Sequence, residues 1–326
     1  MLYAYAVRSG RLSLIERDTP LEQAVWIDLI QPDKDEVALL RGLGVEVPSL
    51  AEMEEIEISS RLYRENGIDY MTAVLPGERP DGVRSAMPVS FLLSHSRLVT
   101  VRHHSPRPFL TFADRAERST LGCGNADRIF LGLVEEIIAR LADILESSGR
   151  VLDETSASVF QQQRPPGRKA GRSAAERLQN ALRKVGHEAE VMAGVRLGLL
   201  TIERILVFHA ARIEERRESG KLRPVIKGQL RDVQALEVHA DFLSARVSLT
   251  VDTILGMINL EQNNAVRILS VISALFLPPT LIASIYGMNF TSMPELDKPW
   301  GYPMALLLML GTSVAIWLFL RWKNWL

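Results

Sequence analysis

The sequence has little cysteine, no clear excess of either charge and no secretion signal. Its 326 residues include one cysteine, Cys123, which excludes an intrachain disulfide and any zinc site built from several cysteines. The formal net charge of -1 gives no support for a nucleic-acid partner. The first residues, MLYAYAVRSG, lack a basic region followed by an apolar block, so we expect no cleaved signal peptide and a cytoplasmic location for most of the chain.

Motifs for ATP-driven or enzymatic chemistry are also missing. There is no G-x-x-x-x-G-K-[ST] loop, and GCGNAD (122–127) lacks the third glycine of a dinucleotide fingerprint. The sequence has no His-Glu-x-x-His pair and no nucleophile elbow, and we interpret His103-His104 as a surface pair, not a metal site. The sequence therefore predicts a protein that is not an enzyme and has no organic cofactor.

Long apolar segments near the C-terminus are what the sequence does contain. Residues 268–286 and 301–320 run for 19 and 20 residues without Asp, Glu, Lys or Arg. At about 1.5 Å per residue, each reaches roughly 28–30 Å as a helix, which is enough to cross a bilayer. Because the two segments stand in tandem, they predict two transmembrane helices and not a buried core helix.

Basic residues flank these segments on one side of the membrane. Arg246 and Arg267 precede the first segment, and Arg321 and Lys323 follow the second. The loop 287–300 has a single basic residue. The positive-inside rule therefore places both termini in the cytoplasm and the loop outside, so that we expect a multi-pass protein of the cell (inner) membrane.

The first 120 or so residues have the pattern of a mixed α/β unit. YAYAV and RLSLIE flank Ser9-Gly10 as a hairpin, and AVWIDLI is strand-like. Pro32 is expected in the first turn of a helix over DKDEVALLRGLG, which glycine closes. Further strands are expected to turn at Asn66-Gly67 and at His95-Ser96.

Long helical patterns begin at about Asn125. Breaks at 164–171 and 218–224 divide them into three helices. The last helix has no strong breaker from Val225 to Pro278-Pro279, so it is a stalk that becomes the first transmembrane helix.

Together these patterns predict an α+β membrane protein with an N-terminal cytoplasmic α/β domain, a long helical stalk and two C-terminal transmembrane helices. The expected boundaries are 1–124 for the α/β domain, 125–267 for the long helices, 268–286 and 301–320 for the transmembrane helices, 287–300 for the external loop and 321–326 for a cytoplasmic tail.

One face of the first transmembrane segment is polar. Steps of three and four residues mark a stripe in which five of eight residues carry a hydroxyl or an amide. The stripe comprises Asn263, Val266, Ser270, Ser273, Leu277, Thr280, Ser284 and Gly287. Such residues either let helices pack closely or line a pore. Since two spans cannot enclose water, a pore needs several copies round an axis, in which Val266, Leu269 and Leu277 form apolar constrictions that block ions by dewetting.

Short motifs stand between and beside the two segments: YGMNF (286–290), MPEL (293–296) and GYP (301–303). Taken alone, Gly287 is typical of a left-handed residue that ends a helix, and Asn289 of a loop. Taken together, and with a proline-containing first segment and KNWL after the second, the motifs closely resemble the CorA family of magnesium channels. The resemblance is strongest over 263–326. It is weaker in the N-terminal part, where VWIDL, Pro32, Glu36 and EMEEIEISSRLY carry it.

The resemblance implies a homopentamer with a cytoplasmic α/β funnel and a pore lined by the first transmembrane helices. It places Gly287, Met288 and Asn289 at the external mouth as the selectivity filter. By matched position, the pore residues of the family fall on Asn263, Val266, Leu269, Leu277, Thr280 and Asn289, and Ser273 and Ser284 join them on the stripe. The family often has methionine where this chain has Val266 and Leu277.

A ring of Asn289 side chains suits the chemistry of Mg²⁺. This ion gives up its water reluctantly, so a selective mouth recognises the hydrated ion through hydrogen bonds to its water shell. Amide oxygens, helped by Gly287 carbonyls, accept such bonds without a full charge, and binding stays weak enough for release. Glu295 and Asp297 lie further along the loop, where they either concentrate cations or are simply solvated.

The resemblance also implies a brake, in which cytoplasmic Mg²⁺ bound by carboxylates between cytoplasmic domains holds the pore closed. Candidate ligands on the stalk are Glu237, Asp241 and Asp252, which fall near one helix face. The alternative is a solvated helix face. The acidic run over 52–57 is similarly ambiguous.

The expected function is therefore potential-driven uptake of Mg²⁺, with Co²⁺ and Ni²⁺ as further ions and Mg²⁺ also as regulatory ligand. The expected partners are further copies of the chain and the lipid bilayer. One alternative keeps the fold and changes the cargo to Zn²⁺, although Met288 and MPEL favour Mg²⁺. A distant alternative is a membrane-tethered scaffold or sensor that carries no flux.

Overall fold

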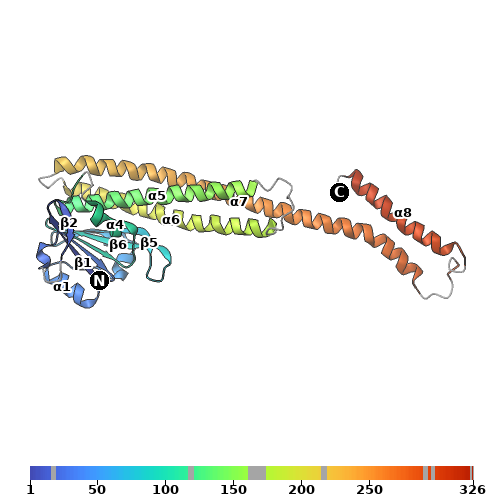
Figure 1. The fold of residues 1–326 in the computed structure, drawn as a ribbon, viewed down its shortest axis with the longest axis horizontal. Helices are drawn as coiled ribbons and strands as arrows, with labels where there is room; N and C mark the ends of the chain where they lie inside the picture. The colour runs from blue at the N-terminus through green and yellow to red at the C-terminus, as the bar shows by residue number, and fades with distance from the viewer. Residues whose placement is uncertain are drawn as a thin grey trace. The chain divides into compact units, whose positions relative to one another are not determined.

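The computed structural model describes residues 1–15, 20–116, 121–160, 174–213, 219–288, 293–294, 298–323 and 325 (Figure 1). The chain divides into two compact units. The first holds Met1–Gly167 and Ala181–Val251, and the second holds Arg168–Asn180 and Asp252–Leu326.

A seven-stranded mixed sheet forms the base of the first unit. Its strands are β1 (Leu2–Arg8), β2 (Arg11–Leu14), β3 (Trp26–Ile30), β4 (Leu62–Glu65), β5 (Ile68–Glu78), β6 (Arg84–Leu93) and β7 (Leu98–Arg102), in the order β2-β1-β3-β7-β6-β5-β4. Only β3 and β7 pair in parallel, because the chain leaves β3 through helices and returns beside it much later.

The hairpin turns expected from the sequence are confirmed. Ser9 and Gly10 join β1 to β2, and both have positive φ angles, of 52° and 80°. Asn66 and Gly67 join β4 to β5 with φ angles of 48° and 83°, as a two-residue hairpin turn with the strand twist requires.

Helices cover both faces of the sheet. On one face lie the short helices α1 (Lys34–Gly42), α2 (Leu50–Glu54) and α3 (Ile58–Arg61). The 3-10 turn η1 (Leu21–Gln23) precedes β3. On the other face lie α4 (Arg107–Arg115), α5 (Ala126–Phe160) and α6 (Ala174–Ile213). The long helix α7 (Ser219–Tyr286) and the last helix α8 (Gly301–Trp322) follow.

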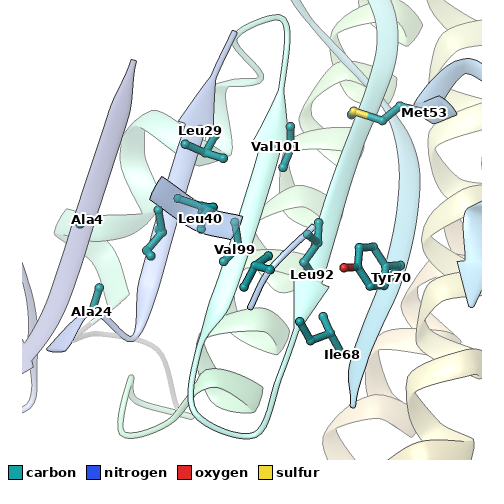
Figure 2. Close-up of a cluster of buried hydrophobic side chains, with 12 residues drawn as sticks. Ala4, Ala24, Leu29, Leu40, Met53, Ile68, Tyr70, Leu92, Val99 and Val101 are labelled. Carbon is teal, nitrogen blue, oxygen red and sulfur yellow. The ribbon is translucent and has the colours of Figure 1, made fainter. Parts of the chain in front are cut away.

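The alternation along β3 shows why both faces are apolar. Ile27 and Leu29 point into a cluster with Leu40 of α1 and Val99 of β7, which Figure 2 shows in close-up. Trp26, which precedes Ile27 and points to the opposite face, meets Phe112 of α4 edge to face, with 5.7 Å between ring centroids. Successive strand residues point to opposite sides, so each face of the sheet receives its own apolar layer.

Two expectations at helix starts were wrong in detail. Pro32 lies outside α1: Asp33 is the N-cap, and its side chain accepts hydrogen bonds from the amides of Asp35 and Glu36. The expected break over 218–224 is helical from Ser219, and Pro224 lies inside α7. Leu222 and Ile226 on either side of Pro224 are 2% and 1% exposed, so their packing outweighs the one hydrogen bond that proline removes.

The interpretation of His103-His104 as a surface pair was wrong for His104. This side chain is 1% exposed, and its Nε2 lies 2.8 Å from the carbonyl oxygen of Leu75. Burial lowers the pKa of His104 to about 4, so the ring is neutral near pH 7. A Cβ at Gly77 would lie 2.4 Å from the His104 ring, so glycine is required there.

The helix α6 approaches the sheet closely through small residues. A Cβ at Gly198 would lie 3.3 Å from the carbonyl oxygen of Val74. One turn further on, the hydroxyl of Thr201 accepts a hydrogen bond of 3.0 Å from the Val74 amide. Val74 lies beyond the residues of β5 that pair with β4, and its amide is satisfied by α6 instead of by a strand.

A buried ion pair joins the two parallel strands. Arg102 of β7 and Asp28 of β3 are 1% and 3% exposed, with 2.9 Å between Nη2 and Oδ2. Thr100 donates a further hydrogen bond to Asp28, and Arg102 donates one to the carbonyl oxygen of His104. The guanidinium also lies 5.1 Å from the centre of the Phe109 ring. The pair is therefore well satisfied by its surroundings.

Arg102→Met is expected to lower the free energy of unfolding of the first unit by about 3–5 kcal/mol, because it leaves the Asp28 carboxylate buried without its partner. Urea unfolding followed by tryptophan fluorescence measures this. The control Arg41→Met removes an exposed pair with Glu46 and is expected to cost at most about 1 kcal/mol. Equal losses in the two variants would contradict a structural role for the buried pair.

Candidate functional site

Two helices of the described residues, α7 and α8, are long and apolar enough to cross a membrane. None of the most apolar 18-residue window of α7 is buried, and only 11% of that of α8 is. Large apolar side chains are exposed along both helices, such as Phe276 at 62% and Leu307 at 68%. These surfaces require lipid or further protein around them.

The less exposed residues of α7 within 268–286 gather on one face. They are Val271, Ala274, Leu275, Pro278, Pro279, Ile282 and Tyr286. The less exposed residues of α8 also gather on one side of the helix: Gly301, Met304, Ala305, Met309, Thr312, Ser313, Ile316 and Leu320. The apolar residues Ile268, Ile272 and Phe276 stay exposed.

The polar stripe lies on the other side of α7. All of its members are exposed in the protomer: Asn263, Val266, Ser270, Ser273, Leu277, Thr280, Ser284 and Gly287. At about 100° per residue, the centre of the stripe is nearly opposite the centre of the covered face. The stripe is therefore available to a neighbour or to water, and Leu269, which is 65% exposed, lies at its edge.

Hydroxyl groups on the two helices differ in their hydrogen bonds. On α8, Thr312 and Ser313 donate to carbonyl oxygens of their own helix, at 2.9 Å to Leu308 and 3.0 Å to Met309. On α7, Thr280 donates to the carbonyl oxygen of Phe276 at 2.7 Å.

Three serines of the stripe have no such bond. Within the described residues, the hydroxyls of Ser270, Ser273 and Ser284 make no hydrogen bond, and neither does the Asn263 amide. A polar group inside a bilayer is costly without a partner. The stripe therefore needs water or polar groups from outside its own protomer.

Two adjacent prolines interrupt the backbone hydrogen bonds of α7 without ending the helix. Pro278 and Pro279 have no N–H, so the carbonyl oxygens of Ala274 and Leu275 receive no helical hydrogen bond. Such carbonyls are tolerated at membrane depth where they reach another partner or water. The prolines thus add polar backbone atoms to a segment that is otherwise apolar.

The start of the predicted selectivity filter closes the end of α7. The Gly287 amide donates to the carbonyl oxygen of Ala283 at 2.9 Å, and the Met288 amide donates to that of Ile285 at 3.3 Å. The φ angle of Gly287 is not in the left-handed region, so the expectation of a left-handed cap is wrong. A Cβ at Gly287 would instead lie 3.0 Å from the Ala283 oxygen, which leaves little room for a side chain.

Other predicted residues of the loop, Asn289, Glu295 and Asp297, lie outside the described residues. Met288 is 47% exposed. On the far side of the loop, the Lys298 ammonium lies 5.2 Å from the centre of the Trp300 ring.

The candidate regulatory carboxylates have neighbours on α6. Asp241 pairs with Arg196 at 2.9 Å, and both side chains are exposed. Burial raises the pKa of Glu237, and the charges of Glu203 and Asp241 raise it further. Repulsion of this kind favours a bound cation. Neither Arg196 nor Glu203 was predicted, because nothing in the spacing of α7 indicates which residues of α6 lie beside it.

No group of three or more His, Cys, Asp or Glu side chains able to hold a metal is formed among the described residues. Asp252, which belongs to the second unit, is exposed and makes no ion pair with the described part of the chain. In the acidic run over 52–57, Glu52 serves as the N3 residue of the capping box of α2, and its hydrogen bonds from Ser49 lower its pKa.

The fold and the two apolar helices define a class of membrane protein with an N-terminal α/β domain, a long helical stalk and two C-terminal transmembrane helices. Residues 22–322 match the family described as CorA-like Mg²⁺ transporter protein. This chain belongs to that family. Its members are transporters, so the chain is not assigned to any enzyme class.

Individual relatives align with this chain over its whole length. The chain is 32% identical over 328 residues to the magnesium transport protein CorA of Haemophilus influenzae and 34% identical over 329 residues to that of Pectobacterium atrosepticum. Both alignments cover 100% of each chain. The structure of the CorA magnesium transporter from Methanocaldococcus jannaschii matches with a TM-score of 0.71 at 16% identity, over 100% of this chain and 99% of that one. At this identity the structural match establishes the fold alone.

Cysteine substitution tests whether the stripe faces water in a pore or packs against another helix. Ser273→Cys and Thr280→Cys are expected to react with a membrane-impermeant thiol reagent, whereas Ile268→Cys and Ile272→Cys, on the exposed apolar side, are expected to stay protected by lipid. The native Cys123 is 2% exposed and gives a low background. Equal labelling of all four variants would contradict a pore along the stripe.

Proposed function

We propose that this chain is one subunit of a homopentameric channel for potential-driven uptake of Mg²⁺, which also admits Co²⁺ and Ni²⁺. The first transmembrane helix, 268–286, surrounds the pore, and the second, 301–320, faces lipid. The curated relatives are named as magnesium transport proteins, which supports Mg²⁺ as the main cargo.

The observation that carries the proposal is the set of serine hydroxyls without partners. Ser270, Ser273 and Ser284 are exposed, unbonded within the described residues and set opposite the covered face of α7. The described residues of a single protomer offer these hydroxyls no hydrogen-bond partner. Several copies around an axis place the stripe against a column of water, which satisfies the hydroxyls and provides a path for a hydrated ion.

Apolar members of the stripe act as gates in this arrangement. Val266, Leu269 and Leu277 are 63%, 65% and 73% exposed in the protomer. Rings of such side chains exclude water from a narrow pore and thereby stop ions. Serine and threonine rings between them keep the remaining path wet.

The mouth of the pore selects the hydrated ion. Gly287, Met288 and Asn289 form the filter, with Asn289 oxygens and Gly287 carbonyls accepting hydrogen bonds from the water shell of Mg²⁺. In the external loop 287–300, Glu295 and Asp297 raise the local concentration of cations.

The membrane potential supplies the driving force. A divalent cation that enters down 100 mV gains about 4.6 kcal/mol, which corresponds to a concentration ratio of about 2,000. This direction of transport requires both termini, including the tail 321–326, to lie in the cytoplasm, with the protein in the cell (inner) membrane. Arg321 and Lys323 stack against Trp317 and Trp322, and such cation and aromatic pairs suit a membrane interface.

Cytoplasmic Mg²⁺ closes the channel by binding between subunits. Glu237 and Asp241 supply carboxylates from one subunit, and Asp252 supplies a further one. The raised pKa of Glu237 supports a cation site, since a bound Mg²⁺ would relieve its repulsion with Glu203 and Asp241. Arg196, which pairs with Asp241 when no metal is bound, must release it.

Flux into liposomes tests the channel. Purified protein under an inside-negative potential is expected to carry Mg²⁺, and Asn289→Ala is expected to abolish this flux. Asn264→Ala removes an amide that lies off the stripe and bonds to Arg267, and it is expected to retain the flux. Light scattering of the same preparation measures the number of subunits.

Absence of Mg²⁺ flux from the wild-type protein would overturn the channel, and Zn²⁺ flux in its place would keep the fold and change the cargo. A particle without five copies would overturn the pentamer.

The double variant Glu237→Gln/Asp241→Asn tests the brake. It is expected to need at least about 100-fold more stalk-side Mg²⁺ for closure, because two hydrogen-bonded charged ligands are lost and each contributes about 1.5–3 kcal/mol. Lowering the pH protonates Glu237 earlier than an ordinary glutamate, so the wild type is expected to need more Mg²⁺ as the pH falls toward that raised pKa. The control Asp232→Asn lies on an exposed position of the same helix and is expected to leave closure unchanged. If the wild type, the double variant and Asp232→Asn all close at the same Mg²⁺ concentration, Glu237 and Asp241 are not ligands of the regulatory site.

A further inference from the structure

A cavity between α4 and α5 is lined by arginines that the proposed transport does not use. Its volume is about 160 Å³. This is about five times the volume that one water molecule occupies in the liquid. The polar residues around it are Arg107, Thr111, Arg115, Glu136, Arg140 and Asp143. All of them belong to the first unit, where α4 packs beside α5 (Figure 1).

Helical spacing brings these side chains to the cavity. Arg107, Thr111 and Arg115 follow one another at intervals of four residues and share a face of α4. Glu136, Arg140 and Asp143 do the same on α5, at intervals of four and three. The opposite side of α4 is anchored in the core, since Phe109 and Phe112 are each 3% exposed.

Two of the three arginines have hydrogen-bond donors to spare. The Arg107 guanidinium makes no hydrogen bond or ion pair with the described residues. The Arg140 guanidinium lies 3.8 Å from the Asp143 carboxylate, which is too far for a hydrogen bond. Both residues line the cavity, so their unused N–H groups are available to a molecule bound there.

The third arginine is held in place by the protein. Arg115 donates to Glu136 at 2.7 Å, and Thr111 donates to the same carboxylate oxygen at 3.2 Å. Glu136 therefore holds Arg115 at the wall of the cavity, and the remaining N–H donors of Arg115 stay available. Three guanidinium groups against two carboxylates leave the cavity with a net positive charge, which disfavours a metal cation and favours an anion.

We propose that this cavity binds the phosphate groups of a small soluble anion. The planar fork of arginine matches the paired oxygens of phosphate, and arginines from two helices approach such a group from both sides. The volume suits inorganic phosphate, inorganic diphosphate or the phosphate chain of a nucleotide. This site is independent of the proposed pore, so its test needs no ion flux.

Calorimetric titration of the full-length protein in metal-free buffer tests the site, with inorganic phosphate, inorganic diphosphate and ATP as separate ligands. At least one of them is expected to bind saturably, and comparison of the three identifies the source of the phosphate group. Arg107→Gln and Arg140→Gln are each expected to weaken binding about tenfold. The control Arg150→Gln, an exposed arginine further along α5, is expected to leave it unchanged.

A gain of affinity provides a test that misfolding cannot imitate. Asp143→Asn removes the carboxylate nearest to Arg140 and is expected to tighten binding about twofold, as for the loss of an exposed competing pair. Absence of saturable binding by all three anions would overturn the proposal. So would equal binding by Arg107→Gln, Arg140→Gln and Arg150→Gln. If no anion binds and Arg107→Gln or Arg140→Gln alters the oligomer, the cavity receives a carboxylate of a neighbouring copy instead.

Discussion

The requirement that polar groups find partners inside a bilayer governs the C-terminal part of this protein. It explains why both apolar segments are helices, which satisfy their backbone internally. It also explains why Thr312 and Ser313 of α8 donate hydrogen bonds to carbonyl oxygens of their own helix. The serines of α7 do not follow this pattern, and the two prolines add carbonyl groups without helical partners. These exceptions gather in the helix that carries the stripe, so α7 requires surroundings that α8 does not need.

The first unit is governed by a different constraint, namely a sheet that is apolar on both faces. Helices must then cover both sides, and α6 lies closest to β5 at Gly198, where a Cβ would come within 3.3 Å of the Val74 carbonyl oxygen. The first half of α7 joins the same layer: Ile226, Val233 and Ala240 are nearly fully buried, and Gln229 donates to the Leu131 carbonyl of α5. The residues of α7 up to Val251 thus belong to a conventional core. Further along the same helix, the most apolar 18-residue window is not buried at all.

Local signals in the sequence were sufficient for the hairpins, the long helices and the apolar spans. Asn66-Gly67 predicts a turn because few other residues adopt its backbone angles, and the period of the stripe follows from helix geometry alone. Contacts between distant segments were not predictable in this way. The parallel pairing of β3 with β7, the burial of His104 and the position of Arg196 beside Asp241 depend on how elements pack together. The filter motif was recognised by resemblance, because Gly287 viewed alone predicted a left-handed cap that the structure does not have.

Side chains at the proposed constrictions bear on how such a pore opens. Methionine, common at these positions in the family, is flexible and can move aside by rotating its own bonds. Val266 is β-branched and has few accessible rotamers on a helix. A valine ring therefore widens only when the helices that carry it move apart. In the proposed channel the gate therefore depends on α7 as a whole: Glu237 and Asp241 stand on the same helix as Val266, so a cation bound by them between subunits would restrain the helix that must move.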